Sequence, residues 1–364
     1  MLKYDTPSTS STEYNRKTST RIATCAVSSF SSIPLLSNSF HNNMYNMYTI
    51  HIIHTNYMID KYIKTLIKNL PENSNHNKGA GDVIDLILDG GIFNGSYLIG
   101  ALLFLKEMEN QHFISVDKIS GCSIGSIAAI LYHLNALHLA SEIYDILLDH
   151  FKTHFTLNVF DVIFTKLDPI MPDDICNTMT NRVYITYYNI EKCKKIVKFK
   201  YKNKLDIFDT IRKSCFFPFI IDGSVTYKNK YCDGFNPYIL PTCPHKKILY
   251  LDLFGNDKIG SLFSVKNEKT NFHRILAGLL DVHLFFIKQT NTQMCSYVND
   301  WSIKHLIHNR VSKVVVEKMI FYSIYFYMII RRYIPENMGE FVVCKMGVKI
   351  MRDIYITLIE NYSL

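Results

Sequence analysis

The sequence predicts an α/β fold with a mostly parallel central sheet, and two observations carry that prediction. The apolar run 83–88 ends in Asp89-Gly90-Gly91, and apolar residues at helical spacing follow it up to about Met108. The same order of strand, glycine turn and helix recurs over residues 114–137. Repeated strand–helix units favour a parallel sheet, because parallel neighbours need a long crossover connection.

Composition limits the broad class of protein. The chain has 364 residues, of which 48% are hydrophobic and 20% charged, and its mean hydropathy is +0.03. These values exclude a disordered acidic chain and a bundle of membrane-spanning helices. The formal net charge of +8 predicts attraction to anionic surfaces, either membrane lipid or nucleic acid.

Changes in amino-acid composition along the chain predict three regions. Residues 1–80 form a polar extension, disordered at its start, with one possible helix in the apolar tract 44–70. Residues 81–300 form the folded domain that carries the motifs discussed below, and residues 301–364 form a helical C-terminal extension. The apolar run 319–330 in that extension is shorter than the roughly 20 residues of a spanning helix, which leaves a core helix or an interfacial anchor.

Further elements follow from hydrophobic periodicity. We expect strands at 183–188, 196–201 and 248–253, helices at 140–155, 207–215 and 272–296, and a hairpin around Asp222-Gly223.

Nine dispersed cysteines, without a CxxC pair or zinc spacing, predict reduced thiols and a cytoplasmic protein. The first thirty residues lack the continuous apolar stretch of a secretory signal, so we expect no secretion.

A candidate nucleophile lies in the second strand–turn–helix unit. The motif G-x-S-x-G needs an apolar strand before it and an amphipathic helix after it, and both are predicted here. On such a turn the serine hydroxyl lies at a helix N-terminus, where backbone N–H groups favour developing negative charge. The motif consists of Gly121, Cys122, Ser123, Ile124 and Gly125.

Glycines one unit upstream are candidates for an oxyanion loop. Gly90 and Gly91 follow the first strand, so a parallel sheet places them at the same carboxyl edge as Ser123. Their N–H groups could hold the oxyanion of an acyl-transfer intermediate. A phosphate-binding loop has a similar pattern, but the G-K-[ST] of a P-loop is missing.

The serine needs a base, and the sequence offers a carboxylate or a histidine. Asp233 ends a short β-like segment and is followed by Gly234, whereas Asp222-Gly223 has the pattern of a hairpin tip. Asp233 would need desolvation beside Ser123 to become an effective base. The late histidines that fit the order of a Ser-Asp-His triad are His245, His273, His283, His305 and His308.

These pieces, in this order, resemble the patatin-like phospholipase family over residues 83–254, with most likeness to divergent members encoded by giant DNA viruses. The resemblance also includes Gly95 to Gly100 as G-x-Y-x-x-G and Ser214 to Pro218 as S-x-x-x-P. It implies a three-layer α/β/α hydrolase that cleaves fatty-acyl esters through a Ser/Asp dyad without a cofactor or metal. Ser123 would be the nucleophile, Asp233 the base, and Gly90 and Gly91 the oxyanion loop.

Three departures from the family pattern leave an alternative open. Ile92 and Asn94 replace the third glycine and a basic residue, and Phe235 follows Asp233-Gly234 where glycine or alanine is usual. The alternative is a catalytically impaired lipid-binding or interaction protein with the same fold.

A lysine-rich segment predicts where the surface could contact a partner. Lys198, Lys200 and Lys202 alternate with apolar residues, which would place their ammonium groups on one face of a strand. Such a row can simply protect an edge strand, or it can bind anionic phospholipid beside a lipid substrate. We expect no nucleic-acid binding, because no known module accompanies the lysines.

Overall fold

The computed structural model describes residues 58–71, 82–255, 258, 260–262, 265, 268–303 and 306–333. The chain divides into two compact units, Met1–Asp60 and Lys61–Leu364, and the sheet and the helices that flank it lie in the second. The predicted disordered start and the last residues of the C-terminal extension lie outside the described residues. A helix at 58–68 falls within the predicted apolar tract, and its Ile63 and Ile67 are buried.

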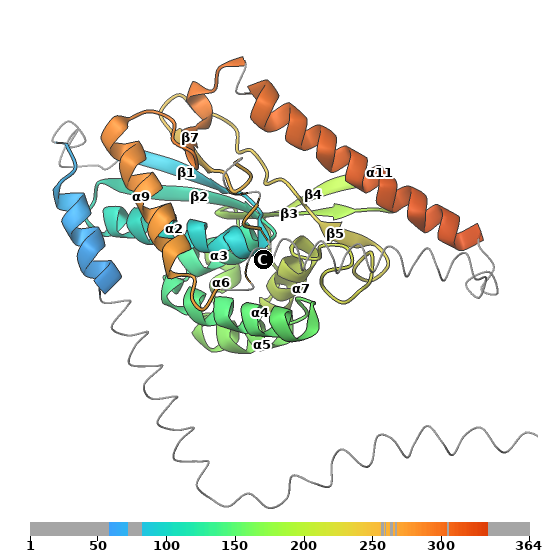
Figure 1. Ribbon diagram of the computed structural model, residues 1–364. Helices are drawn as coiled ribbons and strands as arrows, with labels where there is room; N and C mark the ends of the chain where they lie inside the picture. Colours follow the sequence, from blue (N-terminus) through green and yellow to red (C-terminus); the bar gives the residue numbers. More distant parts are fainter. Residues whose placement is uncertain are drawn as a thin grey trace, which may run out of the picture. The chain divides into compact units, whose positions relative to one another are not determined.

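A seven-stranded sheet forms the centre of the second unit (Figure 1). Its strand order is β4-β3-β2-β1-β6-β7, with β5 paired to β3. The four central strands are parallel, whereas β4, β5 and β7 are antiparallel to their neighbours. The strands are β1 (Asp82–Leu88), β2 (Ile114–Cys122), β3 (Val183–Asn189), β4 (Lys194–Lys198), β5 (Tyr231–Asp233), β6 (Lys247–Leu251) and β7 (Cys295–Tyr297).

Helices flank this sheet in a three-layer α/β/α fold, which confirms the predicted fold class. They are α2 (Gly95–Asn110), α3 (Ile124–His133), α4 (Ala140–His154), α5 (Phe160–Leu167), α6 (Ile175–Met179), α7 (Lys204–Ser214), α9 (Phe272–Lys288) and α11 (Ser312–Tyr333). Short 3-10 turns occur at Ile92–Asn94 (η2), Leu137–Leu139, Asp168–Ile170 and Val298–Asp300, and a π-helical turn, Leu306–Val311, precedes α11.

Close helix packing and an apolar cluster cover the sheet. A Cβ at Gly100 of α2 would collide with the backbone of Ile275, and one at Gly278 of α9 would collide with the backbone of Tyr97. These glycines let α2 and α9 pack backbone to backbone. A separate cluster of Ile87, Leu240, Ile248 and Tyr250 has Trp301 packed against it.

The structure differs from the expected elements in three places. The chain around Asp222-Gly223 forms a turn, but the strand expected after it, β5, pairs with β3 and not with a hairpin partner. Helix α9 ends at Lys288, and the end of the range expected for it enters β7, which extends the sheet beyond β6. Strand β4 ends at Lys198, so Lys200 and Lys202 lie in the connection to α7 and not on a strand. Strand pairing decides these differences, and it depends on segments that are distant in the sequence.

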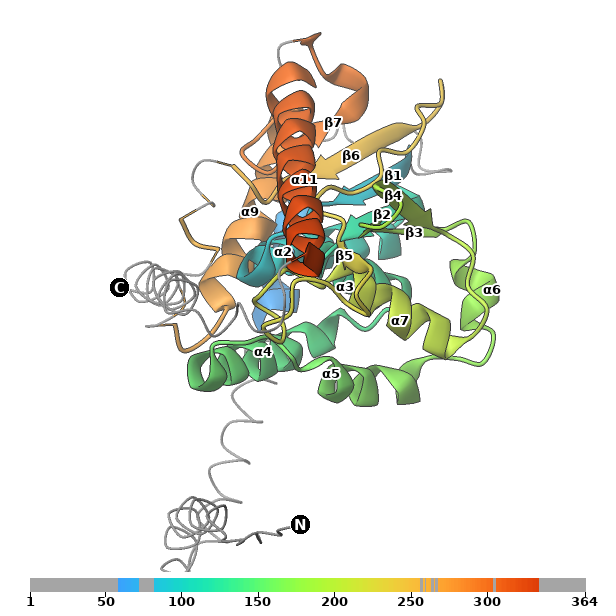
Figure 2. The same cartoon turned by 90° about the vertical axis from the view of Figure 1, so that its right-hand side faces the viewer.

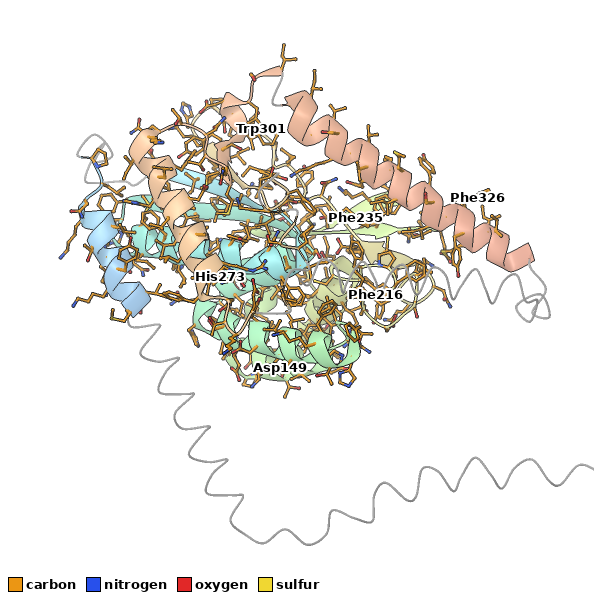
Figure 3. The ribbon with its side chains drawn as sticks, viewed as in Figure 1. Asp149, Phe216, Phe235, His273, Trp301 and Phe326 are labelled. Carbon is orange, nitrogen blue, oxygen red and sulfur yellow. The ribbon has the colours of Figure 1, made fainter. Side chains whose placement is uncertain are left out.

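Helix α11 lies in front of the sheet in Figure 2, and its Lys313 contacts Asp89 and Asp252, which follow the carboxyl ends of β1 and β6. Phe321 and Ile324 on its inner face are buried with Tyr188 and Cys232. The Tyr188 and Phe321 rings stack with centroids 3.4 Å apart. Phe326, on the outer side of the helix, points away from the sheet (Figure 3). The core-helix interpretation of this apolar run therefore holds for its inner face.

Candidate active site

Ser123 occupies a strained turn between β2 and α3. Its backbone has φ 51° and ψ −131°, a conformation that a residue with a side chain adopts only where the surroundings enforce it. The enforcement is steric: a Cβ at Gly121 would lie 2.4 Å from the Gly125 carbonyl oxygen, and one at Gly125 would lie 2.5 Å from the Asp89 oxygen. Both glycines of the motif are thus required by backbone packing.

Hydrogen bonds from two serines fix this turn. The Ser123 N–H donates to Ser214 Oγ at 3.0 Å, and that hydroxyl donates to the Thr186 carbonyl at 2.7 Å. Ser126 Oγ donates to the Ser123 carbonyl at 2.6 Å. Ser214 begins the S-x-x-x-P segment noted in the sequence, and its place in the structure is to link the nucleophile turn to β3.

Asp233 reaches the same place from the end of β5. Its N–H donates to the Phe216 carbonyl at 2.9 Å, and its Oδ1 accepts the Phe235 N–H at 2.8 Å. A Cβ at Gly234 would lie 2.6 Å from the Thr186 carbonyl oxygen, so the glycine lets this loop pack on β3. Oδ2 is buried, without a hydrogen-bond partner in the described part of the chain.

The electrostatics of Asp233 suit a base. The residue is 1% exposed, and burial raises its pKa from 3.8 to about 7. The Ser123 hydroxyl and the Phe235 N–H act in the opposite direction, because both favour the charged carboxylate. An aspartate with a pKa near neutrality is a far better proton acceptor than an exposed one.

The predicted oxyanion loop lies against Ser123, but its two glycines differ in whether their N–H groups are already hydrogen-bonded. A Cβ at Gly90 would lie 3.1 Å from Ser123 Cβ, so the loop is close to the nucleophile. The Gly90 N–H donates to Asp89 Oδ1 at 3.0 Å and is therefore engaged. Gly91, with φ 153°, has no hydrogen bond from its N–H to any described residue.

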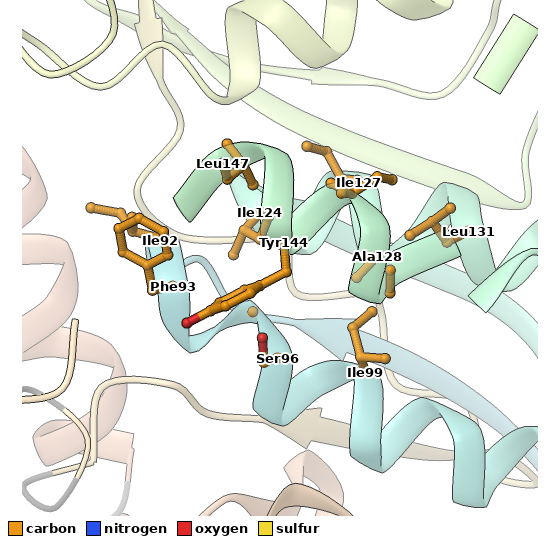
Figure 4. Close-up of a pocket in the computed structure, with 13 residues that line it drawn as sticks. Ile92, Phe93, Ser96, Ile99, Ile124, Ile127, Ala128, Leu131, Tyr144 and Leu147 are labelled. Carbon is orange, nitrogen blue, oxygen red and sulfur yellow. The ribbon is translucent and has the colours of Figure 1, made fainter. Parts of the chain in front are cut away.

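One pocket joins these groups. It has a volume of about 510 Å³, and Ser123, Asp233, Gly90 and Gly91 are all in its wall. Apolar side chains make up much of the remaining lining: Ile92, Phe217, Phe235, Phe254, Leu262, Val316 and Ile320. A smaller apolar gap of about 30 Å³ lies behind the nucleophile turn, among α2, α3 and α4 (Figure 4). It contains neither Ser123 nor Asp233, so we assign the site to the larger pocket.

The three residues that depart from the family's sequence pattern have structural roles. Ile92 and Phe235 line the pocket, and both have positive φ. Asn94 is buried, and its Oδ1 accepts Arg274 Nη1 at 2.6 Å, so a guanidinium from α9 reaches the position where the family has a basic side chain. Phe235 packs on Phe321 of α11, with ring centroids 5.3 Å apart.

The alternative bases lie elsewhere. Asp222 is exposed and accepts the Ser224 N–H in a turn. His245 and His273 are exposed, and His283 packs on Phe104. His305 and the His308 side chain lie outside the described residues. No histidine is among the described residues that line the pocket.

Sequence reasoning missed the contribution of α11. Lys313 Nζ donates to Asp89 Oδ2 at 2.8 Å and to Asp252 Oδ1 at 2.9 Å. Burial raises the pKa of Asp89, and the Lys313 ammonium opposes that rise. Glu317, one turn along the helix, accepts a hydrogen bond from Asn236. The only available signal was a lysine and a glutamate four residues apart in an apolar run, which is common on helices.

Comparison with known proteins agrees with this arrangement. No curated protein matches the chain. The family model described as patatin-like phospholipase matches residues 86–235, from β1 to the residue after Asp233-Gly234. The matched segment carries the glycine loop, the serine turn and the aspartate, so this part of the chain is similar to the patatin-like phospholipase family.

Proposed function

We propose that the protein is a lipid acyl hydrolase with Ser123 as nucleophile and Asp233 as base. The observation that supports this most is the joint position of the two side chains. A serine on a strained turn and a buried aspartate with a pKa near 7 open into one largely apolar pocket.

The proposed reaction uses an acyl-enzyme. Asp233 accepts the Ser123 hydroxyl proton while Ser123 Oγ bonds to the ester carbonyl carbon, and the resulting oxyanion is stabilised by backbone N–H groups. Gly91 and the first N–H groups of α3 are the proposed donors. Asp233 then gives its proton to the departing alcohol. A water molecule, deprotonated by Asp233, then attacks the acyl carbon. The bond from that carbon to Ser123 Oγ breaks, Ser123 takes the proton back from Asp233, and the fatty acid leaves.

Three features of the pocket favour a lipid ester. Its lining is mostly apolar, its volume of about 510 Å³ is within the usual range for a bound small molecule, and Ser123 and Asp233 are both in its wall. We therefore infer a carboxylic ester hydrolase of the phospholipase A or lysophospholipase kind, with a phospholipid or another acyl-ester lipid as substrate.

One observation supports the alternative of a catalytically impaired protein. The Gly90 N–H already donates to Asp89, whereas the Gly91 N–H has no hydrogen-bond partner among the residues that the structure describes. An oxyanion donor is worth about 10²–10³ in kcat, so a missing one would leave a slow enzyme. An impaired protein would still bind lipid in the pocket.

We also propose that the protein is cytoplasmic and contacts anionic membrane surfaces peripherally. The seven described cysteines are all free thiols, which fits a reducing compartment. Lys200 and Lys202 are exposed, whereas Lys198 is half-buried and paired with Asp206 at 2.9 Å. Lys200 and Lys202 are thus the better candidates for lipid contact. Among the described helices, none is long and apolar enough to cross a bilayer.

The proposal is tested by fatty-acid release from mixed phospholipid vesicles in the presence of EDTA. We expect release by the wild type and loss of at least 10³-fold in Ser123→Ala and Asp233→Asn. Asp222→Asn is the matched control, because it makes the same change in an exposed Asp-Gly turn, and it should keep wild-type activity. Equal inactivity of the wild type and all variants, with lipid still bound, would favour the impaired protein.

A further inference from the structure

Helix α11 contacts both loops of the candidate site, although it lies outside the matched residues 86–235. Lys313 reaches the loop that begins at Asp89, and Glu317 reaches the loop that follows Asp233. The two residues are one helical turn apart on the inner face of α11. Between them and just beyond them, Val316 and Ile320 line the pocket.

The Lys313 contact lies at the start of the oxyanion loop. Asp89 follows β1 directly, and Asp252 follows β6, so adjacent parallel strands bring the two carboxylates together. Lys313 Nζ lies between them and also 3.2 Å from the Tyr250 hydroxyl. Asp89 uses Oδ2 for Lys313 and Oδ1 for the Gly90 N–H, which joins α11 to the glycine loop through one side chain.

The Glu317 contact lies beside the base. Glu317 Oε2 accepts Lys195 Nζ at 2.8 Å and the Asn236 side-chain amide. The Asn236 carbonyl in turn accepts Lys195 Nζ at 2.9 Å and Thr186 Oγ1 at 3.1 Å. Asn236 is three residues after Asp233, so this cluster fixes the loop that carries the base.

Buried ion pairs of this kind add little net stability, because desolvation cancels much of the attraction. What they supply is a defined geometry. An oxyanion donor and a base act only when they are held at hydrogen-bond distance from the reacting atoms, and a displacement of about 1 Å can cost 10²-fold in rate.

We propose that α11 is a positioning element of the active site, in which Lys313 orients the oxyanion loop through Asp89 and Glu317 orients the Asp233 loop through Asn236. This inference rests on the proposed function, because it assumes that Ser123 reacts. Lys313 and Glu317 also line the pocket, and the inference predicts that Lys313 acts on the chemical step through the oxyanion loop, so that its loss lowers kcat and leaves KM nearly unchanged.

The test is steady-state hydrolysis of a short-chain p-nitrophenyl ester by the full chain, with thermal melting measured in parallel. We expect Lys313→Met to lower kcat by 10- to 100-fold with little change in KM, and Lys313→Arg to recover part of the loss. Lys318→Met is the matched control on the same helix: Lys318 lies over Tyr188, away from the pocket, and its loss should leave kcat unchanged.

A second variant separates positioning from folding. Lys313→Met leaves Asp89 buried without its cation, so the single variant could fail to fold. The double variant Asp89→Asn/Lys313→Met removes the ammonium together with one of its two carboxylate partners, so the net charge of the cluster is unchanged, and it still breaks the link to α11. We expect its kcat to stay at least 10-fold below wild type. A folded double variant with wild-type kcat would overturn the inference while the dyad stands. A wild type that never turns over would instead contradict the dyad, and with it this inference.

Discussion

At the scale of single residues, the candidate site depends on environment more than on residue type. Asp222 and Asp233 both precede a glycine. Asp222 is exposed and accepts a backbone N–H within a turn, whereas Asp233 is buried beside Ser123. The sequence supported Asp233 through its position after a short strand. It could not show the raised pKa, because desolvation arises from Phe216, Phe235 and α11, which fold around it from elsewhere in the chain.

The raised pKa of Asp233 predicts the pH dependence of hydrolysis. Below a pH of about 7 the carboxyl group of the free enzyme is protonated and cannot accept the Ser123 proton, so kcat/KM should rise with pH through about 7 and level off above it. The measurement is kcat/KM from pH 5 to 9 with a soluble ester. A kcat/KM that is already constant from pH 5 upward would mean that the base has an ordinary pKa.

Glycine positions predict where a single methyl group is costly. Gly234→Ala would place its Cβ 2.6 Å from the Thr186 carbonyl oxygen, whereas a Cβ at Gly260 meets no atom within 4 Å. We expect Gly234→Ala to lower the free energy of unfolding by about 1–3 kcal/mol. Gly260→Ala is the control and should change it by less than about 0.5 kcal/mol. Equal effects in denaturant titrations would refute the close packing of this loop on β3.

At the scale of elements, local periodicity predicted the strand–turn–helix units well and the periphery poorly. The units around Gly90 and Ser123 are local, so their glycines and apolar spacing were sufficient. Strand β7 and the end of β4 depend on pairing with β6 and β3, which short-range patterns do not encode. Helix α11 was expected from its apolar run, but its place across the pocket depends on contacts with Asp89 and Phe235.

The two faces of α11 predict opposite results for two phenylalanines. Phe321 is 2% exposed and stacks on Tyr188, whereas Phe326 is 64% exposed. We expect Phe321→Ala to cost about 3–5 kcal/mol in the free energy of unfolding. Phe326→Ala, as the same change on the outer face, should cost less than about 0.5 kcal/mol. If chemical denaturation shows no difference between the two variants, α11 is not packed as described.

At the scale of the whole molecule, the net charge predicts how the protein behaves towards anionic membranes. The formal net charge of +8 predicts binding to anionic vesicles that weakens as salt is raised. Lys200→Glu/Lys202→Glu should reduce this binding by 10-fold or more in vesicle co-sedimentation. Lys64→Glu/Lys68→Glu makes the same charge change on exposed residues of the helix at 58–68 and serves as the control. An equal loss in both variants would indicate attraction by net charge alone.

The central claim is that Ser123 is a nucleophile activated by Asp233, and covalent labelling tests it most directly. A fluorophosphonate probe, with the adduct located by mass spectrometry, should modify Ser123 in the wild type and in Asp222→Asn. Asp233→Asn should be labelled at least 10²-fold more slowly, because the serine has lost its base. An unlabelled Ser123 in folded wild-type protein, or an undiminished labelling rate in Asp233→Asn, would contradict the Ser123/Asp233 dyad.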